Sequence, residues 1–172
     1  MDIFSHGLWS AAVYKGASLP PRHKKKIGWA VFFGVAPDLF SFGLIFISTL
    51  FATGHIFPQF IGEDGVPHPD LVPSLVHIMY NLTHSLVVFA LVCALVWFLR
   101  KKPFWEMGAW GLHILSDIPT HTSAFFPTPF LWPFSSFHVS GIQWSSPTFL
   151  VWNFTIMALV YIALFIYERK RA

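Results

Sequence analysis

The sequence predicts an all-α integral membrane protein, and three observations support that prediction. Of its 172 residues, 55% are hydrophobic and 11% are charged, which is too apolar for an ordinary soluble domain. Apolar runs of about 20 residues, the length that crosses a bilayer as a helix, recur along the chain. His and Asp residues stand inside these runs, a rare placement that usually marks a functional site. We therefore expect a single transmembrane helical domain over residues 1–172.

The apolar runs predict the individual helices. Four of them are long enough to span: 27–52, 73–99, 103–122 and 148–167. A shorter run over residues 3–19 is expected to span as well, which gives a bundle of four long transmembrane helices plus a short N-terminal helix, five in total. No basic region precedes this run, so we do not expect a cleaved signal peptide. Pro37 should kink its helix, because proline removes a backbone hydrogen bond.

The basic residues predict the orientation in the membrane. All Lys and Arg residues lie in three clusters, at 15–26, 100–102 and 169–171, and the positive-inside rule places these clusters in the cytoplasm. The loops 53–72 and 123–147 contain no Lys or Arg and should lie outside, as should the N-terminus. The net charge of +3 then reflects orientation, and no nucleic-acid partner is expected. The oligomeric state stays open.

Six ionisable residues are candidates for one functional site. His113, Asp117 and His121 follow one another at i, i+4 and i+8 and would share a helix face. Counted from the basic clusters at about 1.5 Å per residue, five candidates lie ~16 to ~24 Å deep, so that four helices contribute to one layer. His121 lies slightly higher, near the outer boundary. The other members of the layer are His6, Asp38 and His84.

Imidazole and carboxylate groups at one depth suggest a metal site, because Zn²⁺ binds both. We predict that metal is bound by four of the candidates: Asp38, His84, His113 and Asp117. His6 and His121 would be the catalytic residues, either completing the ligand shell or acting as general base or acid. The site would open to the extracytoplasmic side.

The candidates also have structural alternatives. His6 could cap the first helix, and Asp38 could accept hydrogen bonds from free helix amides after Pro37. His84 could form an interhelical hydrogen bond. Glu106 is expected to pair with a basic residue. The proline-rich and aromatic outer loops are expected to form rigid lids over a lipid-like substrate, with an aromatic belt as the alternative.

The motifs of the chain resemble those of a known family. SHGLWS at 5–10, the pair Pro37 and Asp38, LTHS at 82–85, and GLHILSD at 111–117 followed by PFLWP at 129–133 are similar to the YdjM-like membrane-bound metal-dependent hydrolases. These are bacterial and archaeal inner-membrane proteins, also labelled LexA-binding hydrolases. The resemblance implies an inner-membrane hydrolase distantly similar to zinc-dependent phospholipase C, and it places His113 and Asp117 on metal.

The chain departs from this family pattern at several positions. Where the family often continues Pro-Asp with x-Asp-His, this chain has Leu39, Phe40 and Ser41. Met79 stands where a His is common, and His121 where many members have a non-ligating residue. Because fewer ligands remain, we expect one or two metal ions rather than three. The metal is expected to be zinc, with another divalent metal as the alternative.

Three functions remain open from the sequence. The first is a zinc-dependent hydrolase of a phosphoester or other ester of a membrane lipid, in which the metal activates water. The second is a transporter or channel for a divalent metal or protons that uses the same His/Asp cluster. The third is a non-catalytic membrane assembly factor. Transporters usually show an inverted repeat and polar residues on both sides of the midplane; neither is evident here, which favours the hydrolase.

Overall fold

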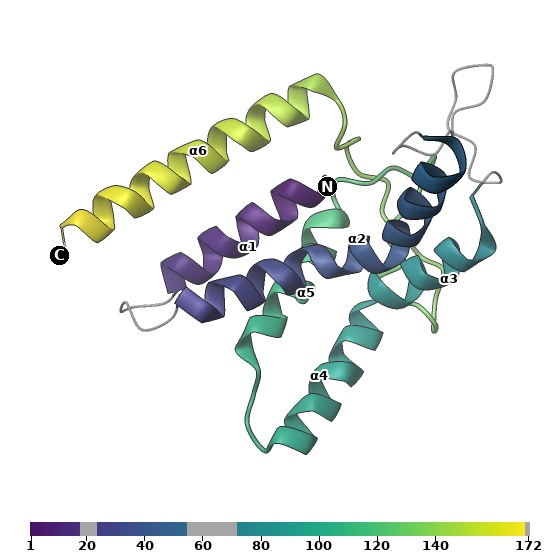
Figure 1. The fold of residues 1–172 in the computed structure, drawn as a ribbon, viewed down its shortest axis with the longest axis horizontal. Coiled ribbons are helices and arrows are strands. Elements are labelled where there is room, and N and C mark those ends of the chain that lie inside the picture. Colours follow the sequence, from purple (N-terminus) through teal and green to yellow (C-terminus); the bar gives the residue numbers. More distant parts are fainter. Residues whose placement is uncertain (18–23, 55–71, 171–172) are drawn as a thin grey trace.

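A computed structural model describes residues 1–17, 24–54 and 72–170, and every regular element in these ranges is helical (Figure 1). This confirms the all-α prediction. Most of the predicted outer loop 53–72 and part of the basic clusters 15–26 and 169–171 lie outside the described residues. The helices are α1 (Ile3–Ala17), α2 (Lys24–Thr53), α3 (Ser74–Thr83), α4 (Leu86–Arg100), the 3₁₀ turn η3 (Trp105–Met107), α5 (Gly108–Asp117) and α6 (Pro147–Arg169).

Helix α1 packs along α2 (Figure 1), and small residues lie at their contact. Ser10 of α1 is buried against Gly34 of α2, and a side chain at Gly34 would overlap it. A Cβ at Gly7 would lie 3.1 Å from Val35 Cγ1, which is a tight contact but not an overlap. Small residues allow two helix backbones to approach closely, which is a common packing mode in membranes. This close approach brings His6 of α1 to the centre of the molecule.

Helix α6 is attached to α1 by polar side chains. Asn153 of α6 donates from its Nδ2 to Ser5 Oγ at 2.7 Å, and its Oδ1 accepts from Trp9 Nε1 at 2.9 Å. At the other end of the pair, Lys15 Nζ lies 3.0 Å from Glu168 Oε2. Polar bonds of this kind fix the position of a helix whose remaining surface is apolar.

Helix α2 continues through Pro37 rather than breaking there. The bend in this helix, 51°, separates residues 26–43 from residues 45–51. Near Pro37, the hydroxyl of Ser41 donates to Pro37 O at 2.7 Å and Thr83 Oγ1 lies 3.4 Å from the same oxygen. Helix α2 is therefore continuous across Pro37 and Asp38, so a break at Pro37 is not found, and the bend of 51° comes after Gly43.

The predicted span 73–99 is broken in the middle. Helices α3 and α4 meet at an angle of 61°, with His84 and Ser85 between them. Ser85 caps α4, because its hydroxyl accepts from the amides of Val87 and Val88 at 3.1 and 3.2 Å. Serine is a favoured N-cap residue, so the LTHS motif is the place where one helix ends and the next begins.

The predicted span 103–122 is also different. It forms a short 3₁₀ turn and then α5, which has 10 residues and is therefore only about 15 Å long. That length does not cross a bilayer. The helix ends at Asp117, two residues before Pro119, which lacks a backbone N–H and disfavours helix in the residue before it. The prediction of a long helix here was wrong.

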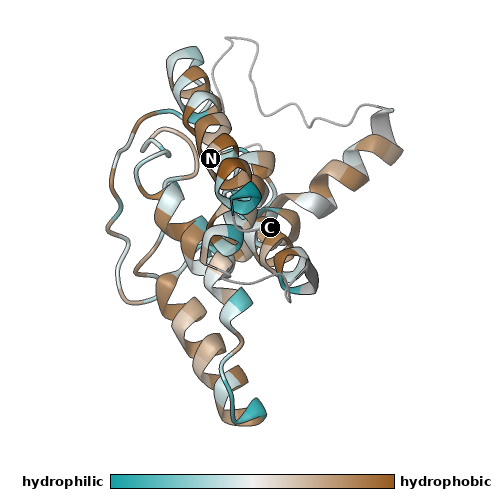
Figure 2. Ribbon diagram, turned by 90° about the vertical axis from the view of Figure 1, so that its left-hand side faces the viewer, coloured by the Kyte–Doolittle hydropathy of each residue, from teal (hydrophilic) through white to brown (hydrophobic). Residues whose placement is uncertain are grey.

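The long helices consist largely of hydrophobic residues (Figure 2), and many of these side chains are exposed. Helix α4 has no buried residue and exposes Leu91, Trp97 and Phe98 by more than 60% of their surface. Within the described residues, α6 is the one helix that is long and apolar enough to span a membrane, and the number rises to three if each bent pair counts as one span. Four long transmembrane helices are therefore not shown.

Candidate metal centre

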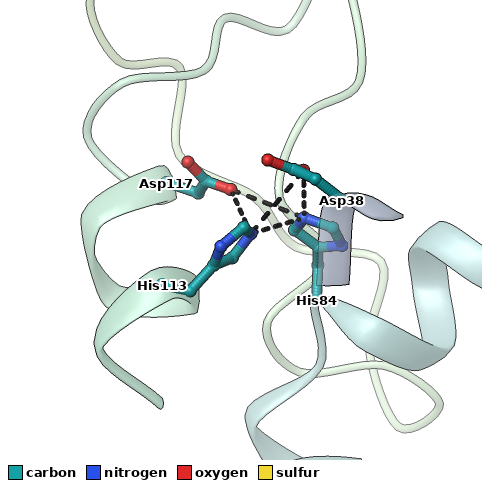
Figure 3. A group of neighbouring side chains, drawn as sticks. All are labelled: Asp38, His84, His113 and Asp117. Carbon is teal, nitrogen blue, oxygen red and sulfur yellow. Dashed lines mark hydrogen bonds and ion pairs between the residues drawn. The ribbon is translucent and has the colours of Figure 1, made fainter. Parts of the chain in front are cut away.

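Four of the predicted residues meet at the centre of the fold (Figure 3). His84 Nε2 lies 3.0 Å from His113 Nε2, 3.5 Å from Asp38 Oδ1 and 3.5 Å from Asp117 Oδ2. His113 Nε2 lies 3.7 Å from Asp38 Oδ1 and 3.2 Å from Asp117 Oδ2. One ligand atom from each residue falls within 4.8 Å of all the others. These four residues are called the His/Asp group below.

Different elements supply the group, so the tertiary fold assembles it. His113 and Asp117 are one turn apart on α5, which places both side chains on one face. Asp38 comes from α2, and His84 from the break between α3 and α4. Three of the four side chains are at most 1% exposed, whereas that of Asp38 is 16% exposed. The group can thus be approached from the side of Asp38.

Both histidines are oriented by backbone carbonyls. His113 Nδ1 lies 2.7 Å from Gly34 O, and His84 Nδ1 lies 3.1 Å from Tyr80 O. A carbonyl oxygen only accepts, so in each ring Nδ1 must carry a proton and donate it. In the neutral tautomer this leaves a lone pair on each Nε2, and both Nε2 atoms point into the His/Asp group. Histidine ligands of metals are usually held in this way.

The two carboxylates of the group give it the charge to bind a cation. Asp38 and Asp117 bring two negative charges together, and a buried charge without a partner is very costly. The amino group of Met1 contacts Asp117 Oδ1, whereas Asp117 Oδ2 and Asp38 Oδ1 both face the two Nε2 atoms, where a metal cation would neutralise them. Consistent with this, Asp117 Oδ2 is buried and has no hydrogen-bond partner among the described residues.

The spacing of the donor atoms also suits a tetrahedral metal. Zinc bonds of about 2.0–2.1 Å require neighbouring ligand atoms to lie about 3.3 Å apart. The five donor pairs described above range from 3.0 to 3.7 Å, whereas the sixth pair, Asp38 with Asp117, is bounded only by the 4.8 Å within which all four donor atoms lie. Two imidazole nitrogens and one carboxylate oxygen therefore have the spacing of metal ligands, and a rotation of the other carboxylate would complete the shell.

The two predicted catalytic histidines lie beside the other oxygen of Asp117. His6 Nε2 is 3.0 Å and His121 Nε2 is 3.5 Å from Asp117 Oδ1. The amino group of Met1 also contacts this oxygen and lies 3.1 Å from His121 Nε2. The ring of His6 stacks on that of His113, with the centroids 3.6 Å apart. All six sequence candidates are thus brought together, with Asp117 linking the metal-ligand candidates to the two histidines.

Tyr80 is a supporting residue that the sequence reasoning missed. Its ring stacks on His84 with centroids 3.9 Å apart, and its hydroxyl donates to Phe126 O at 2.9 Å. His121 Nδ1 lies 2.8 Å from the same carbonyl. The loop after α5 is therefore fastened to both histidines. A tyrosine four residues before a candidate ligand was the available signal, but in an apolar run it resembles any core aromatic.

The predictions for the surroundings have mixed outcomes. Glu106 is buried and lies 3.9 Å from Lys26 Nζ, as expected for a structural ion pair. In the loop 123–147, the backbone oxygens of Phe130 and Trp132 accept from Leu86 N and Ser85 Oγ. This part of the loop is fixed to the start of α4. Whether it acts as a lid stays a prediction.

Comparisons with protein-family models, with curated proteins and with solved structures found no match for this chain. The resemblance to the YdjM-like hydrolases consequently has no support beyond the motifs themselves. The geometry of the His/Asp group is the observation from which a function can be inferred.

Proposed function

We propose that this protein is a membrane-embedded, metal-dependent hydrolase, with zinc as the metal. The observation that supports the proposal is the convergence of two imidazole lone pairs and two carboxylates in a buried group. Such a donor set has the composition of catalytic zinc sites, which combine His with Asp or Glu. When bound, the ion would act as a Lewis acid and lower the pKa of a water molecule.

The exposure of the ligands favours a catalytic role over a purely structural one. Structural zinc sites are closed by four protein ligands, whereas catalytic sites keep a position for water. Three members of the His/Asp group are fully buried, but the side chain of Asp38 is 16% exposed. Asp38 is therefore the ligand that can yield a position to water or substrate. In this arrangement His84, His113 and Asp117 provide the fixed shell.

His6 and His121 are placed to move protons. Both lie next to Asp117 Oδ1, while Asp117 Oδ2 faces the His/Asp group. His6 Nε2 lies 3.0 Å from Asp117 Oδ1, so this nitrogen donates to the carboxylate. The other ring nitrogen, Nδ1, lies 3.4 Å from Ser116 Oγ and is the one that can accept a proton. His121 is held by Phe126 O and is 11% exposed, so it is the more accessible of the two histidines for exchanging protons with a substrate.

The apolar surface supports a position within the membrane. Helix α6 has 23 residues, or about 34 Å, which covers a hydrocarbon core of about 30 Å. We propose that the bent α2 and the broken α3–α4 pair also span, and that α1 and the short α5 are held between them. The basic residues at 100–102 and 169–171 would face the cytoplasm. A substrate at this depth would be an ester or phosphoester of a lipid.

The test combines metal analysis with activity. The purified protein should contain zinc, and a screen of lipid esters and phosphoesters should yield an activity that a chelator removes and zinc restores. His84→Ala and His113→Ala should each reduce the bound zinc by about 10-fold or more, because each removes a direct ligand. His138→Ala, in an exposed part of the loop, is the matched control and should change neither zinc content nor activity.

Two outcomes would contradict the proposal. Full zinc occupancy in both ligand variants would show that the metal binds elsewhere. Retained zinc with no hydrolysis of any ester class, together with zinc flux into proteoliposomes, would favour a transporter. His6→Ala separates the two roles further, because it should retain zinc and lose activity if His6 is a general base.

A further inference from the structure

A cavity of about 250 Å³ lies between α1 and α5. Trp9 and Val13 line it from α1, and Leu112 and Pro119 line it from α5 and the turn after it. Among the described residues, no Asp, Glu, Lys or Arg side chain lines this cavity, although Met1, whose amino group contacts Asp117, does. An apolar cavity with a few polar groups at one end is the usual form of a binding site for a small molecule.

The cavity borders the candidate metal centre through one of its ligand candidates, His113. His6 and His113 both contribute to its wall, and their rings stack with centroids 3.6 Å apart. The Nε2 atom of His113 belongs to the His/Asp group. The ring of His113 therefore separates the cavity from the His/Asp group, where the reaction is proposed to occur.

The other side of the cavity is bordered by exposed apolar residues. Val13 in its wall is 46% exposed, and the neighbouring Leu8 on α1 and Leu115 on α5 are 41% and 55% exposed. Helix α1 packs chiefly on α2 and α6 and only slightly on α5, which leaves the seam between α1 and α5 partly open. In a membrane, such a seam would face lipid chains rather than water.

We propose that this cavity holds the alkyl chain of an amphiphilic lipid substrate, with the ester or phosphoester head at the His/Asp group. This inference rests on the proposed function and names the part of the substrate that the protein recognises. A sugar or nucleotide would find too few polar partners in these walls to replace the water it loses. The size agrees: a cavity of about 150 Å³ admits a six-carbon ring, so 250 Å³ admits about ten carbons.

The experiment uses decyl phosphate with a diazirine at the end of its chain, added to the purified full-length protein in nanodiscs. After illumination, the labelled peptides are identified by mass spectrometry. Label should accumulate on the α1 segment around Val13 and the α5 segment around Leu112, and unlabelled decyl phosphate should compete it away. Label on the exposed faces of α4 and α6 should not saturate, because those faces contact bulk lipid.

Two cavity variants and one matched control make the test specific. Leu112→Trp fills the cavity from α5, and Val13→Trp fills it from α1. Each should reduce the saturable label about tenfold or more, since overpacking a filled site is strongly unfavourable. Leu91→Trp places the same side chain on the exposed face of α4, which does not line the cavity, and should leave the saturable label unchanged. Unchanged saturable label in both cavity variants would overturn the proposal.

The labelling experiment tests the chain-binding cavity independently of the hydrolase proposal. In His84→Ala, saturable label on α1 and α5 should persist at high probe concentration even though zinc and activity are lost. If no variant and no substrate shows hydrolysis but the saturable label remains and follows the cavity variants, the chain-binding site stands and the enzyme proposal fails. If activity is found but no saturable label appears on α1 or α5, the enzyme proposal stands and the cavity inference fails.

Discussion

Gly34 joins the helix packing to the candidate metal centre, so Gly34→Ala should damage both. A Cβ added at Gly34 would overlap Ser10 Oγ and would lie 2.8 Å from Ser10 Cβ and 3.0 Å from the backbone oxygen of His6. Ordinary carbon contacts begin near 3.5 Å, so α1 must retreat by about 0.7 Å. Overpacking of this kind costs about 1–3 kcal/mol of unfolding free energy.

The same displacement should weaken metal binding. The carbonyl of Gly34 accepts a hydrogen bond from His113 Nδ1 at 2.7 Å, and this bond sets the orientation of the ring. Disturbing such a supporting bond usually lowers metal affinity by about 10–100-fold. We therefore expect Gly34→Ala to bind zinc at least tenfold more weakly, measured by competition with a chromophoric chelator. Unfolding in detergent should report the loss of stability.

Two companion variants isolate the steric cause. Gly28 lies on the same helix, and a Cβ there would meet nothing within 4 Å, so Gly28→Ala should be neutral or stabilise by up to about 1 kcal/mol. Ser10→Gly in the Gly34→Ala background removes the two nearest atoms and should restore much of the zinc affinity. Wild-type zinc binding in Gly34→Ala, or no rescue by Ser10→Gly, would refute this reasoning.

Two further predictions follow from the support of His84 and from the proposed orientation. Tyr80→Phe keeps the ring that stacks on His84 but removes the hydrogen bond to the loop after α5. It should lower the free energy of unfolding by about 1 kcal/mol. An unchanged free energy of unfolding would show that this hydrogen bond contributes nothing to stability. In a Cys93→Ser background, a cysteine at Ser136 should react with an impermeant thiol reagent outside intact cells, whereas one at Lys101 should not. The reverse pattern would invert the proposed topology.

The sequence contained the information for residue chemistry and for approximate depth. Apolar runs of spanning length and the separation of basic clusters indicated an all-helical chain with a membrane-spanning element. Counting residues from those clusters placed His6, Asp38, His84, His113 and Asp117 in one layer, and these residues do meet in the structure. The i, i+4 pair on α5 was readable because two residues one turn apart share a helix face without any tertiary contact.

Only the tertiary structure decided where the helices break and which groups support the site. The apolar run 73–99 did not reveal its break at His84, because hydrophobicity stays high on both sides and the break depends on Ser85 capping α4 and on the loop that bonds to it. The apolar run 103–122 did not show that its α-helix, α5, would be only 10 residues long. The carbonyls of Gly34 and Tyr80 that orient the two histidines are backbone atoms, and every residue has one. Helix packing decides which carbonyl lies next to which imidazole ring. The residue types do not reveal this pairing, because it depends on how closely the helices approach one another.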